Sequence, residues 1–152
     1  MNPTTRKVFS IKVKVDTPIV VGQDNINGRR QLIPITSGVL EGDGMHGTVL
    51  PGGVDCQVIR PNGICELSAR YAVALENGCS FYVENNGIRT VPEEEVPKVL
   101  RGEFIDPDLY YFCTKPEFEV FGEELQWMKK KVFFCKAKRY PDLVSLDYYV
   151  IE

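Results

Sequence analysis

A strict alternation of apolar and polar side chains, bounded by two Asn-Gly pairs, constrains the fold more than any other feature of this chain. The alternation runs from Ile64 to Glu76, between Asn62-Gly63 and Asn77-Gly78. Successive side chains of a β-strand point to opposite faces, so this pattern predicts a strand with one buried face. Asn-Gly is the pair that tight hairpin turns favour. The sequence therefore predicts an antiparallel meander from Val54–Arg60 through Ile64–Glu76 into Cys79–Arg89.

Strand-like patterns also fill most of the remaining chain. The further predicted strands are Phe9–Val15, Arg29–Leu40, Met45–Leu50, Tyr110–Phe121, Val132–Ala137 and Leu143–Ile151. Asp24–Gly28 has the composition of a loop, and Pro34 is expected at an edge or a bulge because proline cannot donate to a ladder.

Two short segments have helical features. Thr90 followed by Glu93 fits a capping box, and Pro97 limits any helix before Gly102 to one or two turns. Glu123–Met128 is a second candidate for a helical turn. Nine strands with short connections predict an all-β fold, a single antiparallel meander barrel of eight or nine strands that forms one domain over residues 1–152. Barrel closure also removes exposed sheet edges.

Charge and hydropathy exclude two classes of partner. The net charge is −3, and the only basic run is Lys129–Lys131, which neutralises too few phosphates for nucleic-acid binding. The chain contains neither a leader-like apolar segment nor a stretch long enough to span a bilayer, so we expect no membrane partner and a cytoplasmic location. The sequence leaves homo-oligomer formation open.

The cysteines and the single histidine do not suggest a metal site. The five cysteines are odd in number, contain no C-x-x-C pair and lie in strand-like runs, so we expect buried free thiols. His46, beside a turn, has no second histidine to share a metal. No phosphate-binding, dinucleotide or nucleophile-elbow motif is present, so we expect neither a metal nor a cofactor.

Five short blocks, in order along the chain, carry a resemblance to a known family. They are Arg30–Gly38 (R-x-x-I-P-I-T-x-G), Val49–Asp55 (V-L-P-G-G-x-D), Glu66–Tyr71 (E-L-x-A-R-Y), Tyr82–Arg89 (Y-V-x-N-x-G-x-R) and Tyr110–Phe118 (Y-Y-F-x-T-x-P-x-F). Together they resemble the domain of unknown function 3237 family, also called uncharacterised protein family 0311.

The resemblance implies a calycin or lipocalin-like barrel and brings no settled activity, cofactor or substrate. Three positions depart from the family pattern. Cys56 stands where the family often has Trp, Ser68 where it often has Asp, and Lys129 where it often has Asn. A family site that used those groups would be altered in this chain.

Asp55 and Arg70 are the first candidate ligand-binding residues. Asp55 follows a Gly-Gly turn near a barrel mouth, where a carboxylate can act as a general base or accept from the amides of the turn. Arg70 shares a face with Glu66 and Ser68. That face is either a solvated outer surface with an ordinary ion pair, or the lumen, where Arg70 would bind an anionic oxygen.

The remaining candidates are Tyr82, Asn85, Arg89 and Tyr111. Asn85 and Arg89 share one face of a strand, at a point whose composition fits either a bulge that directs side chains into a site or a twisted corner. Tyr111 lies in an aromatic run that we expect to form part of the wall of the core, and its hydroxyl could face a cavity.

Three functions remain open. The first is an uncharacterised barrel that binds a small molecule in an aromatic-walled pocket with an Arg, Asp and Asn cluster. The second is a cofactor-independent enzyme of isomerase, cyclase or lyase type, with Asp55 as acid-base and Arg70 as anion stabiliser. The third is an interaction module with a solid core, which the absence of a lumen would indicate.

Overall fold

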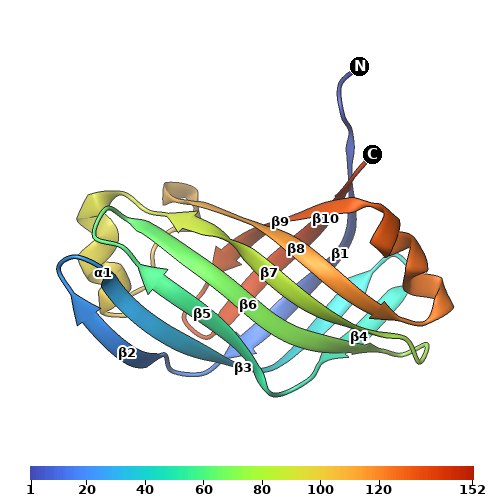
Figure 1. The fold of residues 1–152 in the computed structure, drawn as a ribbon, viewed down its shortest axis with the longest axis horizontal. Helices are drawn as coiled ribbons and strands as arrows, with labels where there is room; N and C mark the ends of the chain where they lie inside the picture. Colours follow the sequence, from blue (N-terminus) through green and yellow to red (C-terminus); the bar gives the residue numbers. More distant parts are fainter.

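The strands close into one antiparallel barrel, as predicted (Figure 1). The computed structural model describes residues 1–152. Its strands are β1 Thr5–Val15, β2 Ile19–Asp24, β3 Gly28–Gly42, β4 Met45–Val49, β5 Gly53–Ile59, β6 Ile64–Leu75, β7 Ser80–Thr90, β8 Tyr111–Phe121, β9 Val132–Arg139 and β10 Leu143–Ile151. Closure occurs at β1, which pairs with β10 on one side and β3 on the other.

Ten strand segments occupy eight positions around the barrel, because two positions are each filled by two segments. β4 and β5 both lie between β3 and β6, separated by the turn at Leu50–Gly52. β2 continues β1 along β3 beyond a break at Asp16–Pro18, where pairing with β3 moves from Val15↔Ile35 to Ile19↔Leu32. The barrel is thus eight-stranded, and β2 is the segment that the sequence did not predict.

The two Asn-Gly turns form hairpins for identifiable local reasons. The side-chain oxygen of Asn62 accepts from the backbone N–H of Ile64, and that of Asn77 accepts from the N–H of Cys79. Gly78 has φ +90°, a left-handed conformation that a residue with a Cβ rarely adopts. The first turn fixes the register of β5 against β6, and the second fixes that of β6 against β7, in which Ala69 lies opposite Asn85 and Cys65 opposite Arg89.

Aromatic side chains fill one end of the barrel. Phe9 lies 4.9 Å from Tyr148 between ring centroids, and Phe118 lies 5.1 Å from Phe133 and 5.3 Å from Phe81. The 3₁₀ helix η3, Glu123–Lys130, closes this end with the buried side chains of Leu125 and Met128. In Figure 1 it is the orange coil, at the opposite end of the barrel from α1. Apolar burial and aromatic contacts make this the packed end.

The helical segments near α1 lie at the other end. The 3₁₀ turn η1, Glu93–Glu95, leads into α1, Val96–Leu100, and η2, Pro107–Leu109, precedes β8. The predicted capping box is wrong: Pro92, not Thr90, precedes η1, and no side chain caps it. Pro97 is accommodated because it lies in the first turn of α1, where its missing N–H has no helical partner.

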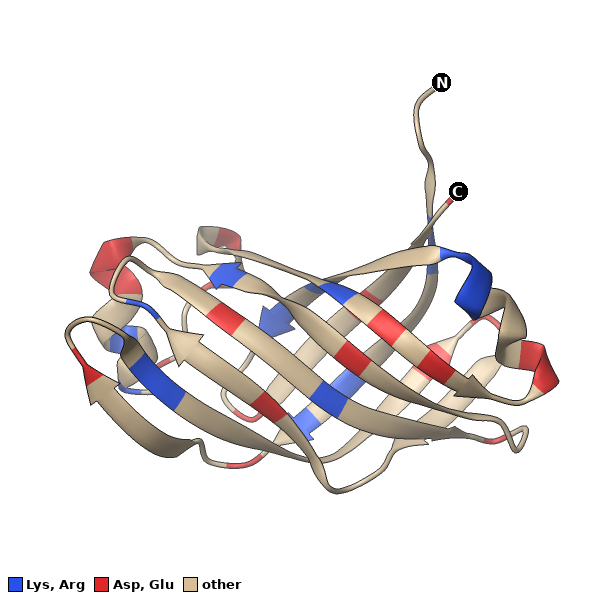
Figure 2. Ribbon diagram, viewed as in Figure 1, with Lys and Arg blue, Asp and Glu red and all other residues tan.

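Charged residues of both signs are interspersed along the strands (Figure 2). None of the helices is of a length and apolarity that would let it cross a lipid bilayer. The inward faces instead contribute one continuous cluster of buried apolar residues. The few polar side chains that do point inward are concentrated toward the end near α1, and they define the candidate site.

Candidate functional site

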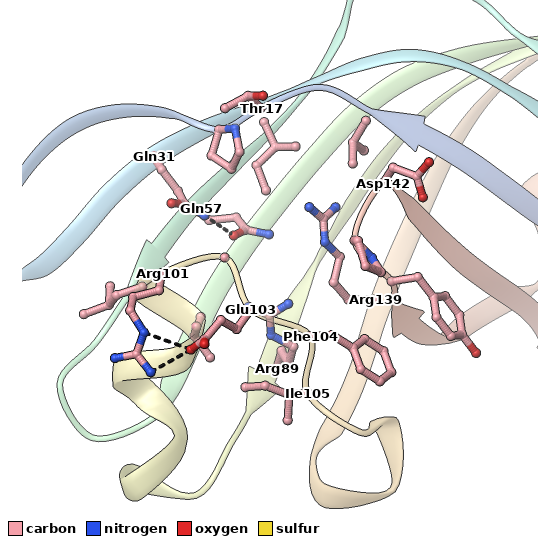
Figure 3. Close-up of a pocket in the computed structure, with 18 of the residues that line it drawn as sticks. Thr17, Gln31, Gln57, Arg89, Arg101, Glu103, Phe104, Ile105, Arg139 and Asp142 are labelled. Carbon is pink, nitrogen blue, oxygen red and sulfur yellow. Dashed lines mark hydrogen bonds and ion pairs between the residues drawn. The ribbon is translucent and has the colours of Figure 1, made fainter.

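A cavity of about 600 Å³ opens at the end of the barrel near α1 (Figure 3). Its walls come from the mouth ends of several strands, with Gln31 on β3, Gln57 on β5, Arg89 on β7 and Arg139 on β9. The segment after α1 and the turn between β9 and β10 complete the rim. There Phe104 and Tyr140 stack with ring centroids 6.0 Å apart.

β7 and β9 contribute charged side chains to this cavity because their inward faces change from apolar to polar along the strand. On β7 the inward residues pass from Phe81 and Val83 at the packed end to Arg89 at the mouth. On β9 the same change runs from Phe133 to Arg139. Strand periodicity fixes which residues point inward, and the position along the strand decides whether they pack in the core or line the cavity.

A chain of hydrogen bonds connects the cavity wall to a buried carboxylate. Gln31 Nε2 donates to Gln57 Oε1 at 3.0 Å, and Gln57 Nε2 donates to Asp55 Oδ2 at 2.8 Å. Burial raises the pKa of Asp55 above its ordinary value, while the hydrogen bond from Gln57 and the charges of Arg89 and Arg139 act in the opposite direction. Asp55 Oδ1 is buried with no hydrogen-bond partner.

Two arginines bring positive charge into the barrel without a close carboxylate. Arg89 is 8% exposed, its Nε is buried without a partner, and its guanidinium carbon lies 5.8 Å from the ring centroid of Phe112. The pKa of Arg139 is lowered below its ordinary value, mainly by burial and secondly by the positive charge of Arg89. Neither arginine belongs to any of the ion pairs in the structure.

Below the cavity lies a second set of buried polar groups. The hydroxyls of Tyr71 and Tyr148 are 2.6 Å apart, and Asn85 Nδ2 donates to the Tyr148 hydroxyl at 3.2 Å. Burial raises the pKa values of both tyrosines, so both hydroxyls are protonated at neutral pH. Burial likewise raises the pKa of Cys65 to about 11 and that of Cys135 to about 12.

All five cysteines are free thiols, and Cys65, Cys79 and Cys135 are buried. Cys56 and Cys113 are partly exposed. No group of three or more His, Cys, Asp or Glu side chains is arranged so that it could hold a metal ion.

The structure divides the six sequence-derived candidates into two groups. Asp55, Asn85 and Arg89 point into the barrel, where Arg89 lines the cavity and the other two lie deeper. Arg70, Tyr82 and Tyr111 lie on the opposite faces of their strands, outside the cavity.

The interpretation of Arg70 as a lumen residue is therefore wrong. Arg70 lies 3.6 Å from Glu84 in an ion pair whose side chains are 55% and 40% exposed. The face that carries Glu66, Ser68 and Arg70 is the solvated outer surface, because Leu67 and Tyr71 on the alternate face fill the core. Tyr111 is 57% exposed and supplies no core wall.

Sequence reasoning missed three residues that line the cavity, Gln31, Gln57 and Arg139. Gln31 and Gln57 are the only glutamines that are buried, and they lie opposite each other in the β3–β5 pairing. For Gln31 the available signal was a polar residue on the same strand face as Ile33 and Ile35. Gln57 had no such signal, because the more apolar face of its strand is the opposite one. Arg139 lay beyond the predicted end of its strand, so its face could not be assigned.

Comparisons with known proteins identify relatives over the whole chain. Residues 3–151 match the model of a family described as "Protein of unknown function (DUF3237)". A UPF0311 protein of Clostridium acetobutylicum is 54% identical over 146 residues, which cover 96% of this chain and 92% of that protein.

Two solved structures show the same barrel. A crystal structure of a protein of unknown function from Clostridium acetobutylicum has a TM-score of 0.95 at 51% identity, covering 100% of this chain and 99% of that one. A structure described as a beta-barrel like protein from Acinetobacter baumannii has a TM-score of 0.85 at 25% identity, covering 100% and 98%. The resemblance that the five sequence blocks indicated is thereby confirmed.

Proposed function

The chain belongs to the DUF3237 family of proteins of unknown function, and from the chemistry of its cavity we propose that it binds a small organic anion. The carboxylate or enolate oxygens of this ligand would face Arg89 and Arg139. The apolar part would occupy the space between the β-strands and the rim. The proposal depends mainly on one observation, which is the charge balance of the cavity.

The cavity interior carries more positive than negative charge. Arg89 and Arg139 are balanced only by Asp55, whose carboxylate is buried behind Gln57 and is itself disfavoured by burial. The other acids of the cavity lie at its rim, where Asp16 and Asp142 are exposed to solvent and Glu103 pairs with Arg101 at 2.6 Å. A buried guanidinium without a partner is costly, and an anionic ligand would offset that cost.

The size and lining of the cavity suit a ligand of one or two rings. Pockets for small molecules typically enclose about 300–1,000 Å³ and combine apolar walls with a few fixed polar groups. Here Ile33, Val91 and Ile105 supply apolar wall, while Tyr110 presents a hydroxyl that also accepts from the backbone N–H of Arg139 at 2.8 Å. A cavity of this size also argues against the solid interaction module.

Binding is favoured over proton-transfer catalysis by the position of Asp55. The enzyme hypothesis pairs Asp55 with Arg70, and Arg70 lies outside the barrel. Asp55 does not line the cavity, and its hydrogen-bonded connection to the cavity runs through Gln57. A general base must come within hydrogen-bond reach of the proton that it removes.

The test is to measure benzoate binding by isothermal titration calorimetry in the wild type and in Arg139→Met. Methionine keeps an unbranched chain of carbon and sulfur but removes the charge. We expect affinity to fall about tenfold or more, since a hydrogen bond to a charged group contributes about 1.5–3 kcal/mol.

Arg70→Met is the matched control, because it removes a guanidinium from the outer surface of the same barrel. We expect this variant to bind benzoate as the wild type does. Equal losses in the two variants, or no binding of benzoate and its larger naphthoate analogue by the wild type, would contradict the proposal.

A further inference from the structure

The hydrogen bonds from Asp55 to Gln31 have a fixed direction. An ionised carboxylate can only accept, so Asp55 requires the amide nitrogen of Gln57 to face it. The carbonyl oxygen of Gln57 then faces Gln31. Gln31 must therefore turn its own amide nitrogen toward Gln57 and donate to that oxygen. Because each amide has its donor at one end and its acceptor at the other, the carboxylate sets the orientation of both glutamines.

The last acceptor in this chain is the carbonyl oxygen of Gln31. It accepts no hydrogen bond from any group of the protein, and it is not among the buried polar atoms that lack a partner. Gln31 itself lines the cavity and is 6% exposed (Figure 3). An acceptor is therefore presented at the cavity wall, in a cavity whose two inward-pointing arginines, Arg89 and Arg139, can only donate.

We propose that Asp55 is a positioning residue that makes Gln31 a specificity-determining acceptor, so that the preferred ligand carries a hydroxyl or N–H donor in addition to its anionic group. This inference rests on the proposed function and deepens it from an organic anion to a hydroxy acid or an enol acid. Asp55 acts through Gln57 and Gln31 and does not contact the ligand.

Ligand discrimination by such an acceptor is strong when the donor is missing or blocked. A methoxy group in place of a hydroxyl leaves Gln31 without its donor and adds a methyl group to a confined space. A site that is built to hydrogen-bond a group rejects analogues that lack it, because its own polar atom then remains unpaired.

The experiment compares benzoate with the three isomeric hydroxybenzoates and the three corresponding methoxybenzoates by isothermal titration calorimetry near neutral pH. In the wild type, at least one hydroxybenzoate should bind about fivefold or more tightly than its methoxy counterpart, which corresponds to one net hydrogen bond. Gln31→Met should make the affinities for that hydroxybenzoate and its methoxy counterpart similar, because the acceptor is gone.

Asp55→Asn gives a second readout that a merely structural role would not produce. An asparagine can turn either its oxygen or its nitrogen to Gln57, so the orientation of the two glutamines is no longer fixed. We expect the preference for the hydroxyl to fall. The affinity for benzoate itself should rise, because the carboxylate that competes for Arg89 and Arg139 is gone.

The outcomes separate this inference from the proposed function. If benzoate binds and Arg139→Met weakens it, but no hydroxyl preference exists or Gln31→Met leaves it intact, only the inference is overturned. A fall of both benzoate affinity and hydroxyl preference in Asp55→Asn also overturns it, since that would indicate general disruption. If no acid binds to the wild type, the proposed function fails and the inference fails with it.

Discussion

At the scale of single residues, the tyrosine pair in the middle of the barrel shows how a buried hydroxyl is stabilised. Tyr148 is the more central of the two, because it contacts both the Tyr71 hydroxyl and Asn85 Nδ2. Tyr71 has Tyr148 as its only hydrogen-bond partner. Burying a polar group without a partner costs more than a hydrogen bond contributes, so the two hydroxyls differ in what their removal leaves behind.

We expect Tyr148→Phe to destabilise the protein more than Tyr71→Phe. The first change leaves both Tyr71 and Asn85 Nδ2 unpaired, at a cost of about 1–3 kcal/mol for each such group. The second leaves Tyr148 bonded to Asn85. Urea denaturation followed by circular dichroism gives the two free energies of unfolding.

The double variant should cost less than the sum of the single changes, since neither hydroxyl then remains unpaired. Equal costs for the two single variants would show that the Tyr71 hydroxyl finds another partner when Tyr148 is gone.

The inward or outward orientation of the candidates on β6 and β7 follows from the apolar residues that share a strand face with them. Asn85 and Arg89 share a face with Phe81 and Val83, and this apolar start of β7 indicates the core side. Arg70 stands between two apolar neighbours on β6, which places it outside. Its motif context suggested function, whereas its periodicity pointed correctly to the surface.

At the scale of elements, the contact between β7 and β8 depends on one glycine. A Cβ on Gly87 would lie 2.3 Å from the backbone oxygen of Cys113 and 2.5 Å from Thr114 Cα. Gly87 lies opposite Thr114 in the ladder, so the two strands approach closely there. The missing side chain also leaves room between Asn85 and Arg89 on the inward face of β7.

Gly87→Ala should lower the free energy of unfolding by about 1–3 kcal/mol, because the strands must separate to admit the methyl group. Gly22→Ala is the matched control, since Gly22 also lies in a strand, a Cβ there would meet no atom within 4 Å, and its φ is not positive. There we expect no loss, or a gain of up to about 1 kcal/mol from the stiffer unfolded chain. Urea denaturation of both variants distinguishes the two cases, and equal effects would rule out close packing as the reason for glycine at position 87.

The elements that sequence analysis predicted best are those with full alternation and a defined turn, such as β6 and β7. β2 escaped prediction because it has no alternating pattern: all of its residues are exposed, Pro18 precedes it and Gly22 interrupts it. Its strand conformation depends on pairing with β3 through tertiary structure, which a local pattern cannot show.

At the scale of the whole molecule, the two ends of the chain meet beside the barrel seam (Figure 1). The backbone N–H of Thr4 donates to the oxygen of Glu152 at 3.1 Å, and the N–H of Glu152 donates to the oxygen of Thr4 at 2.8 Å. Closure itself was predicted from the number of strands and from the family resemblance. The cavity was not, because its volume depends on how the side chains of non-neighbouring strands pack together.

A circular permutant that joins the original ends with a short Gly-Ser linker and opens between Asp43 and Gly44 should fold. Both residues of that turn are exposed, and it lies between two strands that stay paired at Gly42↔Met45. We expect a melting temperature within a few degrees of the wild type, measured by circular dichroism. A permutant opened between Val83 and Glu84, inside β7, is the control and should not fold.

The separation of an aromatic packed end from a polar mouth also has an evolutionary consequence. Gln31, Gln57, Arg89 and Arg139 come from four different strands, and none of them belongs to the buried apolar cluster that holds the barrel together. A substitution at one of these positions changes the chemistry of one wall of the cavity and leaves the buried apolar residues of the core unchanged. Descendants of one ancestral barrel can therefore exchange one ligand for another by single steps, each of which passes through a folded protein.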